Sequence, residues 1–196
     1  MEAGSAAAPA NAVVGPNAVI QLAGALRDAA GLDRTRDLFF DAGLPGLLAA
    51  PPRKMVEEAM ARALFDELWQ AFPADQASEI ASEAGRRTAD YVIANRIPRL
   101  ARWVFALLPK RPACRLLLRA IDRNAWTFVG SGTCTVRFGQ TPSIEIENNP
   151  LAMPDCAWHC AVFDRMFRRL VSADARVDHA NSRRGNAEVC LFRIHL

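Results

Sequence analysis

The sequence lacks the features that define several large protein classes. No stretch approaches the ~20 consecutive apolar residues of a membrane-spanning helix. Residues 1–12 are rich in alanine but carry neither a basic segment nor a long apolar one, so they do not resemble a secretory signal. The five cysteines are odd in number and show no disulfide-framework spacing. We therefore expect a reduced, soluble, cytoplasmic protein with at most peripheral membrane contact.

Motifs for redox cofactors are also missing from the sequence. No G-x-G-x-x-G pattern follows a predicted strand and opens a helix, and Gly130-Ser131-Gly132 is too short to serve. We find no flavin signature and no set of cysteines suited to an iron–sulfur cluster. Because the chain offers no NAD(P) or flavin motif, the sequence argues against redox chemistry that relies on this chain alone.

The length is typical of a single globular domain, and the charge does not indicate a nucleic-acid-binding protein. The net charge is only +3, and the Lys and Arg residues are dispersed among acidic ones. With 196 residues, of which 51% are hydrophobic, the chain can bury a sizeable core. We predict one domain over residues 13–196, preceded by a disordered tail over residues 1–12.

Apolar periodicity predicts a helical first half followed by strands. Helices are expected over 15–29, 33–41, 54–72, 74–95, 98–109, 112–124 and 154–171, and extended segments over 126–129, 133–138, 143–147, 175–181 and 188–195. This order is typical of an α+β fold, with N-terminal helices packed on a small antiparallel sheet and one helix between strands. Gly85 interrupts a predicted helix, which indicates a close approach by another backbone or a ligand.

Two thiols and an imidazole gather at the start of the helix predicted over 154–171. Cys156, His159 and Cys160 lie one turn apart at the mouth of an apolar stripe, and Asp155 is the expected N-cap. A helix N-terminus stabilises negative charge, so this position favours thiolate over thiol. The stretch is therefore the main candidate for reactive or metal-binding chemistry.

Five short motifs carry a resemblance to a known family. They are GPNAVIQLAGAL, AWTFVGSG, NNP, C-x2-HC with VFDRMFRRLV, and VCLFRI. From about Val14 to Leu196 the chain resembles the bacteriochlorophyll 4-vinyl reductases of the vinyl-4-reductase domain family. That family is related to heme-NO-binding sensor domains and to TRAPP vesicle-tethering subunits. The resemblance implies N-terminal helices on an antiparallel sheet, with a cavity for an apolar ligand.

The chain departs from the wider family near its C-terminus. Family members commonly carry a Cys, then a Gly, then a Cys before the final strand. Gly185 and Cys190 fit this outline, whereas the upstream cysteine is absent and His179 is the nearest replacement.

The resemblance implies a role in bacteriochlorophyll biosynthesis and photosynthesis. Because no redox motif is present, we interpret the chain as a carrier of a magnesium tetrapyrrole, such as divinyl protochlorophyllide or magnesium protoporphyrin. It would deliver this intermediate to pathway enzymes such as magnesium chelatase, a methyltransferase or a cyclase. The alternative is the vinyl reductase itself, supplied with electrons by a partner. Family analogy alone favours a homodimer.

A tetrapyrrole carrier needs flat apolar walls, an axial ligand or hydrogen-bond donor for magnesium, and cations for the propionate. His159 is the candidate axial ligand. The candidate wall and cation residues are Trp103, Trp126, Phe128, Trp158, Phe163, Arg96 and Arg99. These residues also have a simpler interpretation, in which the aromatic side chains are core, the arginines are solvated and His159 is structural.

Two further interpretations stay open. Cys156, His159 and Cys160, with either Cys190 or His179, would supply four zinc ligands, although sequence neighbours such as His159 and Cys160 rarely bind one ion. The cysteines are otherwise small buried residues. The TRAPP relationship instead suggests a sensor or assembly module, with a partner interface at the Leu47-Leu48 loop and on arginine-rich faces.

Overall fold

A computed structural model describes residues 12–185 and 187–196, and the tail expected over 1–12 lies almost entirely outside the described residues. The helices are α1 (Asn17–Asp41), α2 (Pro45–Ala49), α3 (Glu58–Ala71), α4 (Ala74–Asn95), α5 (Arg99–Leu107), α6 (Lys110–Arg123) and α7 (Ala157–Leu170). The strands are β1 (Val13–Val14), β2 (Val56–Glu57), β3 (Thr133–Arg137), β4 (Ser143–Glu147), β5 (Arg176–Arg184) and β6 (Ala187–His195), and two 3-10 turns are η1 (Ala125–Thr127) and η2 (Pro154–Cys156). Helices α1 to α6 precede the main sheet and α7 lies between its strands β4 and β5, which confirms the predicted α+β fold.

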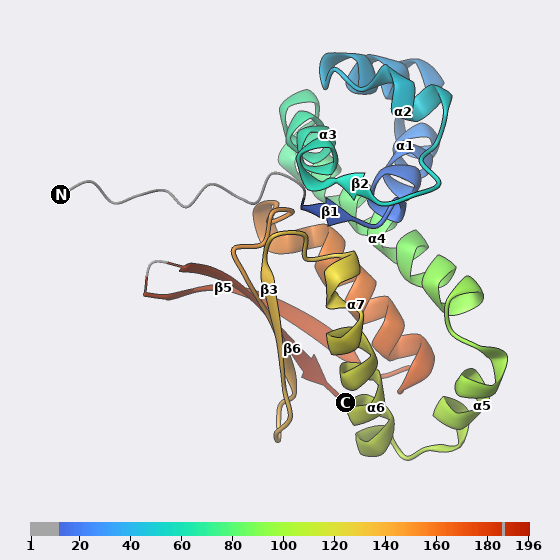
Figure 1. Cartoon of the computed structure of the whole chain (residues 1–196), viewed down its shortest axis with the longest axis vertical. Coiled ribbons are helices and arrows are strands. Elements are labelled where there is room, and N and C mark those ends of the chain that lie inside the picture. Colours follow the sequence, from blue (N-terminus) through green and yellow to red (C-terminus); the bar gives the residue numbers. More distant parts are fainter. Residues whose placement is uncertain (1–11, 186) are drawn as a thin grey trace.

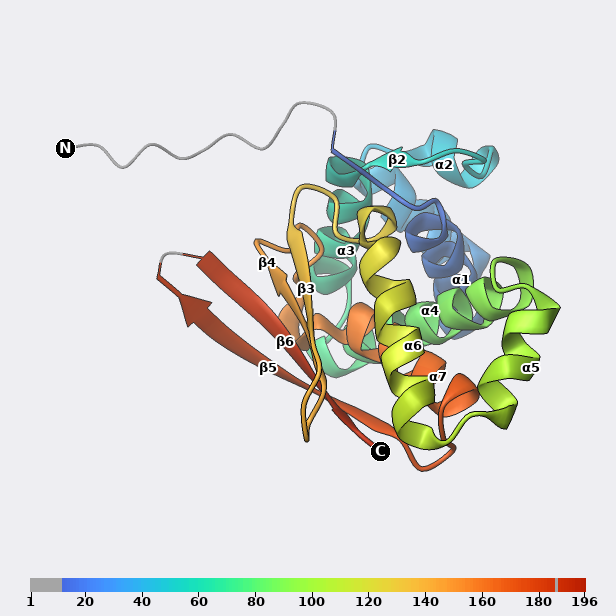
Figure 2. The same cartoon turned by 60° about the horizontal axis from the view of Figure 1, so that its bottom comes forward.

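The main sheet is antiparallel throughout, in the order β3-β4-β6-β5. Cys190, Phe192 and Ile194 alternate along β6 on its buried face, as the two-residue period of a strand requires. Helix α7 packs on this face, where the Phe163 and Phe192 rings meet edge to face at 5.1 Å. The sheet and α7 therefore enclose the C-terminal part of the core (Figures 1 and 2).

Helix α4 is the central helix and packs against both α1 and α7. Its contact with α7 depends on Gly85, because a Cβ there would lie 2.4 Å from the Trp158 carbonyl oxygen and 2.9 Å from the Ala161 Cβ. The predicted close approach at this glycine is confirmed, and the approaching group is backbone rather than ligand. Across the same interface, Arg165 donates two hydrogen bonds to the Asp90 carboxylate, at 3.0 and 2.9 Å.

Helix α1 changes direction at Gly31, whose φ of 85° lies in the left-handed region that glycine adopts most easily. The two helices predicted over 15–29 and 33–41 are thus the two arms of α1. Below this bend, α5 lies at the edge of the molecule, away from the sheet (Figures 1 and 2). Within the described residues, no helix is both long and apolar enough to cross a lipid bilayer.

The structure corrects the sequence prediction at several boundaries. Val56 and Glu57 do not begin a helix but form β2, which pairs with β1, so a tertiary contact overrides the helical periodicity. Trp126 lies in the η1 turn rather than in a strand, because the Phe128 amide bonds back to the Ala125 carbonyl. The Leu47-Leu48 pair, expected in a loop, lies in α2. Asp155 does not cap α7, since it has a φ of 59° and makes no capping hydrogen bond.

Candidate functional site

His159 lies at the centre of the buried aromatic core beneath α7, with 1% of its surface exposed. Its Nδ1 lies 3.4 Å from the Asn149 amide nitrogen, and its Nε2 lies 3.2 Å from the Phe128 carbonyl oxygen. A neutral imidazole satisfies both contacts when Nε2–H donates to the carbonyl and Nδ1 accepts from the amide. Burial lowers the His159 pKa to about 4, which agrees with a neutral ring.

Four aromatic side chains surround His159 and interlock with it. Trp158 and Phe128 meet the imidazole edge to face, with ring centroids at 4.7 and 6.1 Å, and Phe128 also packs on Phe163 at 5.7 Å. Phe192 closes the cluster from β6. In this conformation both ring nitrogens have partners and the rings fill the space between them. An axial ligand at His159 would require this packing to open.

A second cluster forms where the start of α7 meets strands β5 and β6. Cys156, His179 and Cys190 each offer one ligand atom, and these atoms all lie within 4.8 Å of one another. The Nε2 of His179 is buried and has no hydrogen-bond partner among the described residues. Cys156 sits in the left-handed region, with a φ of 43°, which is strained for a non-glycine residue. The arrangement therefore holds a thiol in a fixed, costly position beside a nitrogen that lacks a partner.

The thiols of this cluster differ in acidity. Hydrogen bonding from the Cys156 thiol, assisted by His179 and Asn149, lowers the Cys190 pKa to about 5. The same hydrogen bond and burial raise the pKa of the Cys156 thiol. Burial also raises the Cys160 pKa to about 11. The prediction that the start of α7 favours thiolates is therefore wrong for both of its cysteines, and the acidic thiol belongs to β6.

The structure separates the predicted metal ligands. Cys156 and Cys190 come together, with His179 as the imidazole. Cys160 points elsewhere, with its Sγ 3.4 Å from the Val177 carbonyl oxygen, and His159 bonds to Asn149 and Phe128. A cleft of about 420 Å³ lies beside the cluster and includes both His179 and Cys160 in its lining.

The predicted tetrapyrrole-binding residues fall into two separate groups. His159, Phe128, Trp158 and Phe163 lie in or against the packed core beneath α7. The others lie at the surface, and Trp103 on α5 and Trp126 in η1 are 69% and 61% exposed. Arg96 and Arg99 flank the start of α5 and are exposed as well. These seven aromatic and cationic candidates and His159 therefore do not form one enclosed site in this conformation.

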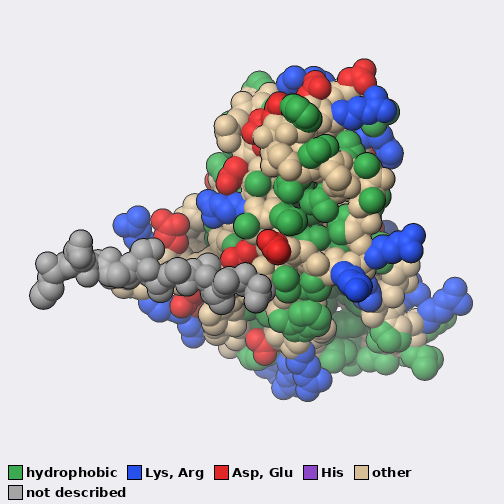
Figure 3. Space-filling model, turned by 45° about the horizontal axis from the view of Figure 1, so that its top comes forward, with side chains coloured by type: hydrophobic (Ala, Val, Ile, Leu, Met, Phe, Trp, Pro, Cys, Tyr) green, Lys and Arg blue, Asp and Glu red, His purple; other side chains and the backbone are tan. Residues whose placement is uncertain are grey.

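A larger cavity lies at the opposite end, in the bend of α1. It has a volume of about 890 Å³, and its apolar lining includes Ile20, Leu32 and Phe40 from α1 and Leu47 and Leu48 from α2. Phe40 is 71% exposed, although it is a large aromatic residue. In Figure 3, which brings this end of the molecule forward, hydrophobic side chains gather between Lys and Arg side chains. We call this cavity the α1–α2 groove.

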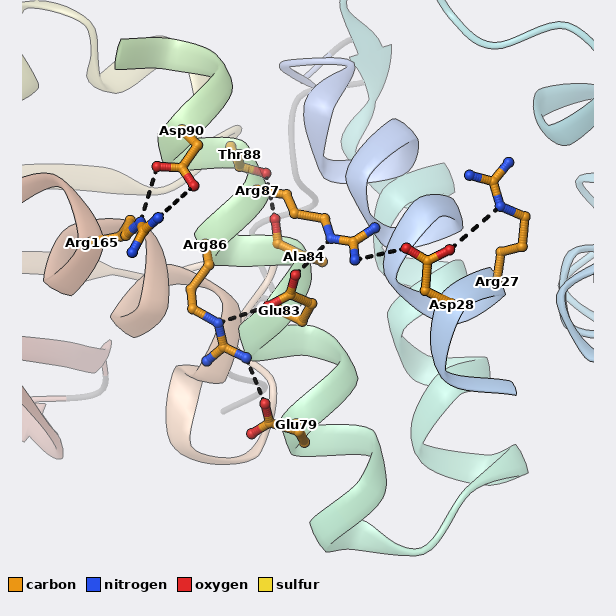
Figure 4. Close-up of polar contacts among 10 residues, drawn as sticks. All are labelled: Arg27, Asp28, Glu79, Glu83, Ala84, Arg86, Arg87, Thr88, Asp90 and Arg165. Carbon is orange, nitrogen blue, oxygen red and sulfur yellow. Dashed lines mark hydrogen bonds and ion pairs between the residues drawn. The ribbon is translucent and has the colours of Figure 1, made fainter. Parts of the chain in front are cut away.

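Three arginines and one acidic residue line the α1–α2 groove. Arg27, Arg36 and Arg87 are the cations, and Asp37 is the acid. Figure 4 shows Arg27 and Arg87 turned toward the same Asp28 carboxylate, at 3.7 and 2.9 Å. Because Arg87 comes from α4, this carboxylate ties the groove to the central helix. The groove thus offers apolar walls beside guanidinium groups, which suits a flat apolar molecule that carries a carboxylate.

Sequence reasoning missed the groove because its residues show no motif. Phe40 and Leu32 lie beside the bend of α1 at Gly31, and the structure leaves both exposed. Asn149 was expected only as part of the NNP motif, yet its amide bridges His159 and the Cys190 thiol, at 3.4 and 3.6 Å. His179 was expected only as an alternative to Cys190, yet the strand register pairs it with Phe192, so it shares a sheet face with Cys190 and both contribute to the cluster.

Comparison with known proteins identifies the fold and the family. No family model matches the sequence. Solved structures of mutant H-NOX proteins share the fold. One from K. algicida, in the Fe(II) unliganded form, has a TM-score of 0.62 and 9% identity, covering 93% of this chain and 97% of that one. One from T. tengcongensis has a TM-score of 0.58 and 12% identity, covering 90% and 93%. The expected relationship to heme-NO-binding domains is therefore confirmed at the level of the fold.

Two relatives are similar along almost the whole sequence. The bacteriochlorophyll synthase 23 kDa chain of Rhodobacter capsulatus is 35% identical over 190 residues, covering 93% of this chain and 86% of the relative. That of Cereibacter sphaeroides is 36% identical over 187 residues, covering 92% and 89%. These matches confirm the resemblance to a bacteriochlorophyll-biosynthesis family, and the chain belongs to the family of the bacteriochlorophyll synthase 23 kDa chains.

Proposed function

We propose that this chain acts in bacteriochlorophyll biosynthesis by binding a magnesium tetrapyrrole intermediate and carrying it between enzymes of the pathway. The relatives' names support the pathway. Solved structures with this fold include one described as modulating the heme redox potential through porphyrin distortion, so the fold accommodates a tetrapyrrole in another protein. Reduction of a vinyl group stays a prediction of the family resemblance, and it would require electrons from a partner.

The observation that carries the proposal is the α1–α2 groove. Its volume of about 890 Å³ lies within the range of sites that bind small molecules and cofactors. The exposed Phe40 ring and the Leu47-Leu48 pair would cover an apolar macrocycle face, and such burial is favourable by about 25 cal/mol per Å². Arg27 and Arg36 would bind the propionate, because guanidinium groups pair with carboxylates in a bidentate geometry.

The α1–α2 groove and the core around His159 are two alternative positions for the tetrapyrrole. Ligation of magnesium by His159 would break one of its two hydrogen bonds and leave a buried polar group without a partner. Such a loss costs about 1–3 kcal/mol. Binding in the groove would leave both hydrogen bonds of His159 intact. We therefore place the tetrapyrrole in the groove and treat His159 as the competing position.

The test is an absorption titration of the purified protein with magnesium protoporphyrin. We expect Arg27→Gln with Arg36→Gln to raise Kd by about 10-fold or more, as expected for a lost charged contact of about 1.5–3 kcal/mol. Phe40→Ser removes an apolar ring from the groove wall and should also raise Kd. His159→Gln and the control Phe138→Ser, which changes an exposed ring outside the groove, should leave Kd unchanged. Weaker binding in His159→Gln with unchanged groove variants would contradict the groove and place the ligand beneath α7.

The carrier role has its own readout. Protein loaded with the tetrapyrrole should pass it to a pathway methyltransferase or cyclase faster than the free pigment reaches that enzyme. Equal rates with loaded protein and with free pigment would contradict carrying, even where binding is tight.

We also propose a zinc site at Cys156, His179 and Cys190, which the buried, unpartnered nitrogen of His179 favours. Two thiolates and one imidazole are ligands that zinc prefers. With three protein ligands, a fourth position of a tetrahedral ion would remain for another donor.

Elemental analysis and cobalt(II) spectroscopy test this site. We expect about one zinc per chain, lost in Cys190→Ser and in His179→Ala. Cys160→Ser is the matched control, because this thiol lies on the same helix but bonds to the Val177 carbonyl. Zinc loss in the Cys160 variant, or metal-free wild-type protein after growth with zinc, would contradict the site.

A further inference from the structure

Helix α5 presents its apolar stripe to the solvent instead of to the core. Leu100, Trp103, Val104 and Leu107 follow the i, i+3, i+4, i+7 spacing of one helix face, and they are 80%, 69%, 46% and 82% exposed. Phe105 is the buried residue of this helix. A surface helix normally turns such a stripe inward, so four exposed apolar side chains in one row indicate an interaction surface.

The segment that contains this stripe is also strongly basic. Residues 96–123 carry eight basic residues and a single acidic one, whereas the other 168 residues of the chain carry 16 basic and 20 acidic ones. The dispersed charge of the whole sequence thus conceals one concentrated stretch. The basic residues are Arg96, Arg99, Arg102, Lys110, Arg111, Arg115, Arg119 and Arg123.

Cations bracket the apolar stripe at both ends. Arg96 and Arg99 precede it, and Lys110 and Arg111 follow it, all of them exposed. Lys110 pairs with Asp174 at 3.4 Å, while the three arginines form no ion pair with other described residues. In Figure 3, hydrophobic side chains with Lys and Arg beside them lie along the lower right of the molecule, where Figure 1 places α5. The surface therefore combines protruding apolar side chains with free positive charge.

We propose that α5 is a membrane-docking helix that lies on the surface of an anionic lipid bilayer. Leucine and tryptophan side chains would enter the boundary between headgroups and acyl chains, and the flanking arginines and Lys110 would pair with lipid phosphates. The surface protrudes at the edge of the molecule, and a fluid bilayer accepts protruding side chains without a matching groove (Figures 1 and 2). With nine residues, α5 is too short to span the bilayer, so the association is peripheral.

This inference does not depend on the proposed function. It rests on the exposure of the apolar stripe of α5 and on the charge of residues 96–123.

The test is flotation of the full chain with vesicles of phosphatidylcholine alone or with added phosphatidylglycerol. We expect binding to the anionic vesicles, at least 10-fold weaker in Leu100→Ser with Leu107→Ser. Arg99→Gln with Arg111→Gln should weaken binding and flatten its salt dependence, because fewer phosphate contacts are made. Both pairs are exposed, so their melting temperatures should match the wild type.

Phe40→Ser is the matched control, since this residue is as exposed as Trp103 but lies in the groove at the other end of the molecule. Its vesicle binding should equal that of the wild type. Failure of the wild type to float with anionic vesicles, or equal flotation of the Leu100/Leu107 variant, would overturn the proposal and leave the surface to an acidic protein partner. If the wild type floats equally well with vesicles of phosphatidylcholine alone and with anionic vesicles, the proposed role of the arginines and Lys110 is overturned.

Discussion

Replacing Gly85 by alanine is expected to destabilise the protein, although alanine is the better helix former. The gain in helix propensity is about 1 kcal/mol. Against it, the new Cβ would lie 2.4 Å from the Trp158 carbonyl oxygen and 2.9 Å from the Ala161 Cβ. Neither atom is the end of a flexible side chain, so α4 and α7 must separate and lose contacts along their interface.

The size of the effect follows from these two opposing terms. Overpacking a tight interface costs about 1–3 kcal/mol, and a contact this short belongs at or above the upper end. After the propensity gain, we expect a net loss of about 2 kcal/mol. For a chain of this length, that loss lowers the melting temperature by roughly 4–8 °C.

Urea denaturation followed by circular dichroism measures the free energy of unfolding of Gly85→Ala. Gly24→Ala is the matched control, because it is also within a long helix but its Cβ would meet the flexible end of Arg87 at 3.3 Å. This control should be unchanged or more stable by up to about 1 kcal/mol. If Gly85→Ala equals Gly24→Ala in stability, the close packing of α4 on α7 is refuted.

Three further predictions concern pH and polar contacts. Since the His159 pKa falls to about 4 from an ordinary 6.5, its contribution to stability is complete above pH 6.5 and lost as the pH falls to 4. Denaturation of metal-free protein across this range should show a loss of about 3 kcal/mol that His159→Gln lacks, and parallel curves for the two would disprove the shift. Asp90→Asn should cost less than about 1 kcal/mol, because its ion pair with Arg165 is half-exposed; a loss above 2 would contradict this. Glu58→Ala removes the acceptors for the Ser131 amide and hydroxyl, at 2.7 and 2.8 Å, so hydrogen exchange at the Ser131 amide should accelerate, and unchanged exchange would speak against this anchor.

Local periodicity predicted much of the fold because most elements match their apolar patterns. The helix predicted over 74–95 is α4, and the alternating strand over 143–147 is β4. Gly85 was informative because a glycine in a helix costs stability unless something requires the space. The β1–β2 pair was missed, since Val13-Val14 and Val56-Glu57 are distant in sequence and each is too short to show a period.

The candidate sites were only partly predictable, because spacing in sequence does not give direction in space. Cys156, Cys190 and His179 were all candidates, but Cys160 diverges, and Cys190 and His179, expected as alternatives, lie together with Cys156. The apolar stripe with Trp103 was expected to face a ligand or the core, yet α5 turns it to the solvent. The groove at Phe40 depends on the bend at Gly31, and no local pattern specifies what lies across such a bend.

The central claim is tested most directly by an absorption titration of the wild-type chain with magnesium protoporphyrin. The account predicts a shifted Soret band that saturates at one pigment per chain, with a Kd in the micromolar range or below and full retention of the folded state. A spectrum identical to that of free pigment at every protein concentration would contradict tetrapyrrole binding by this chain.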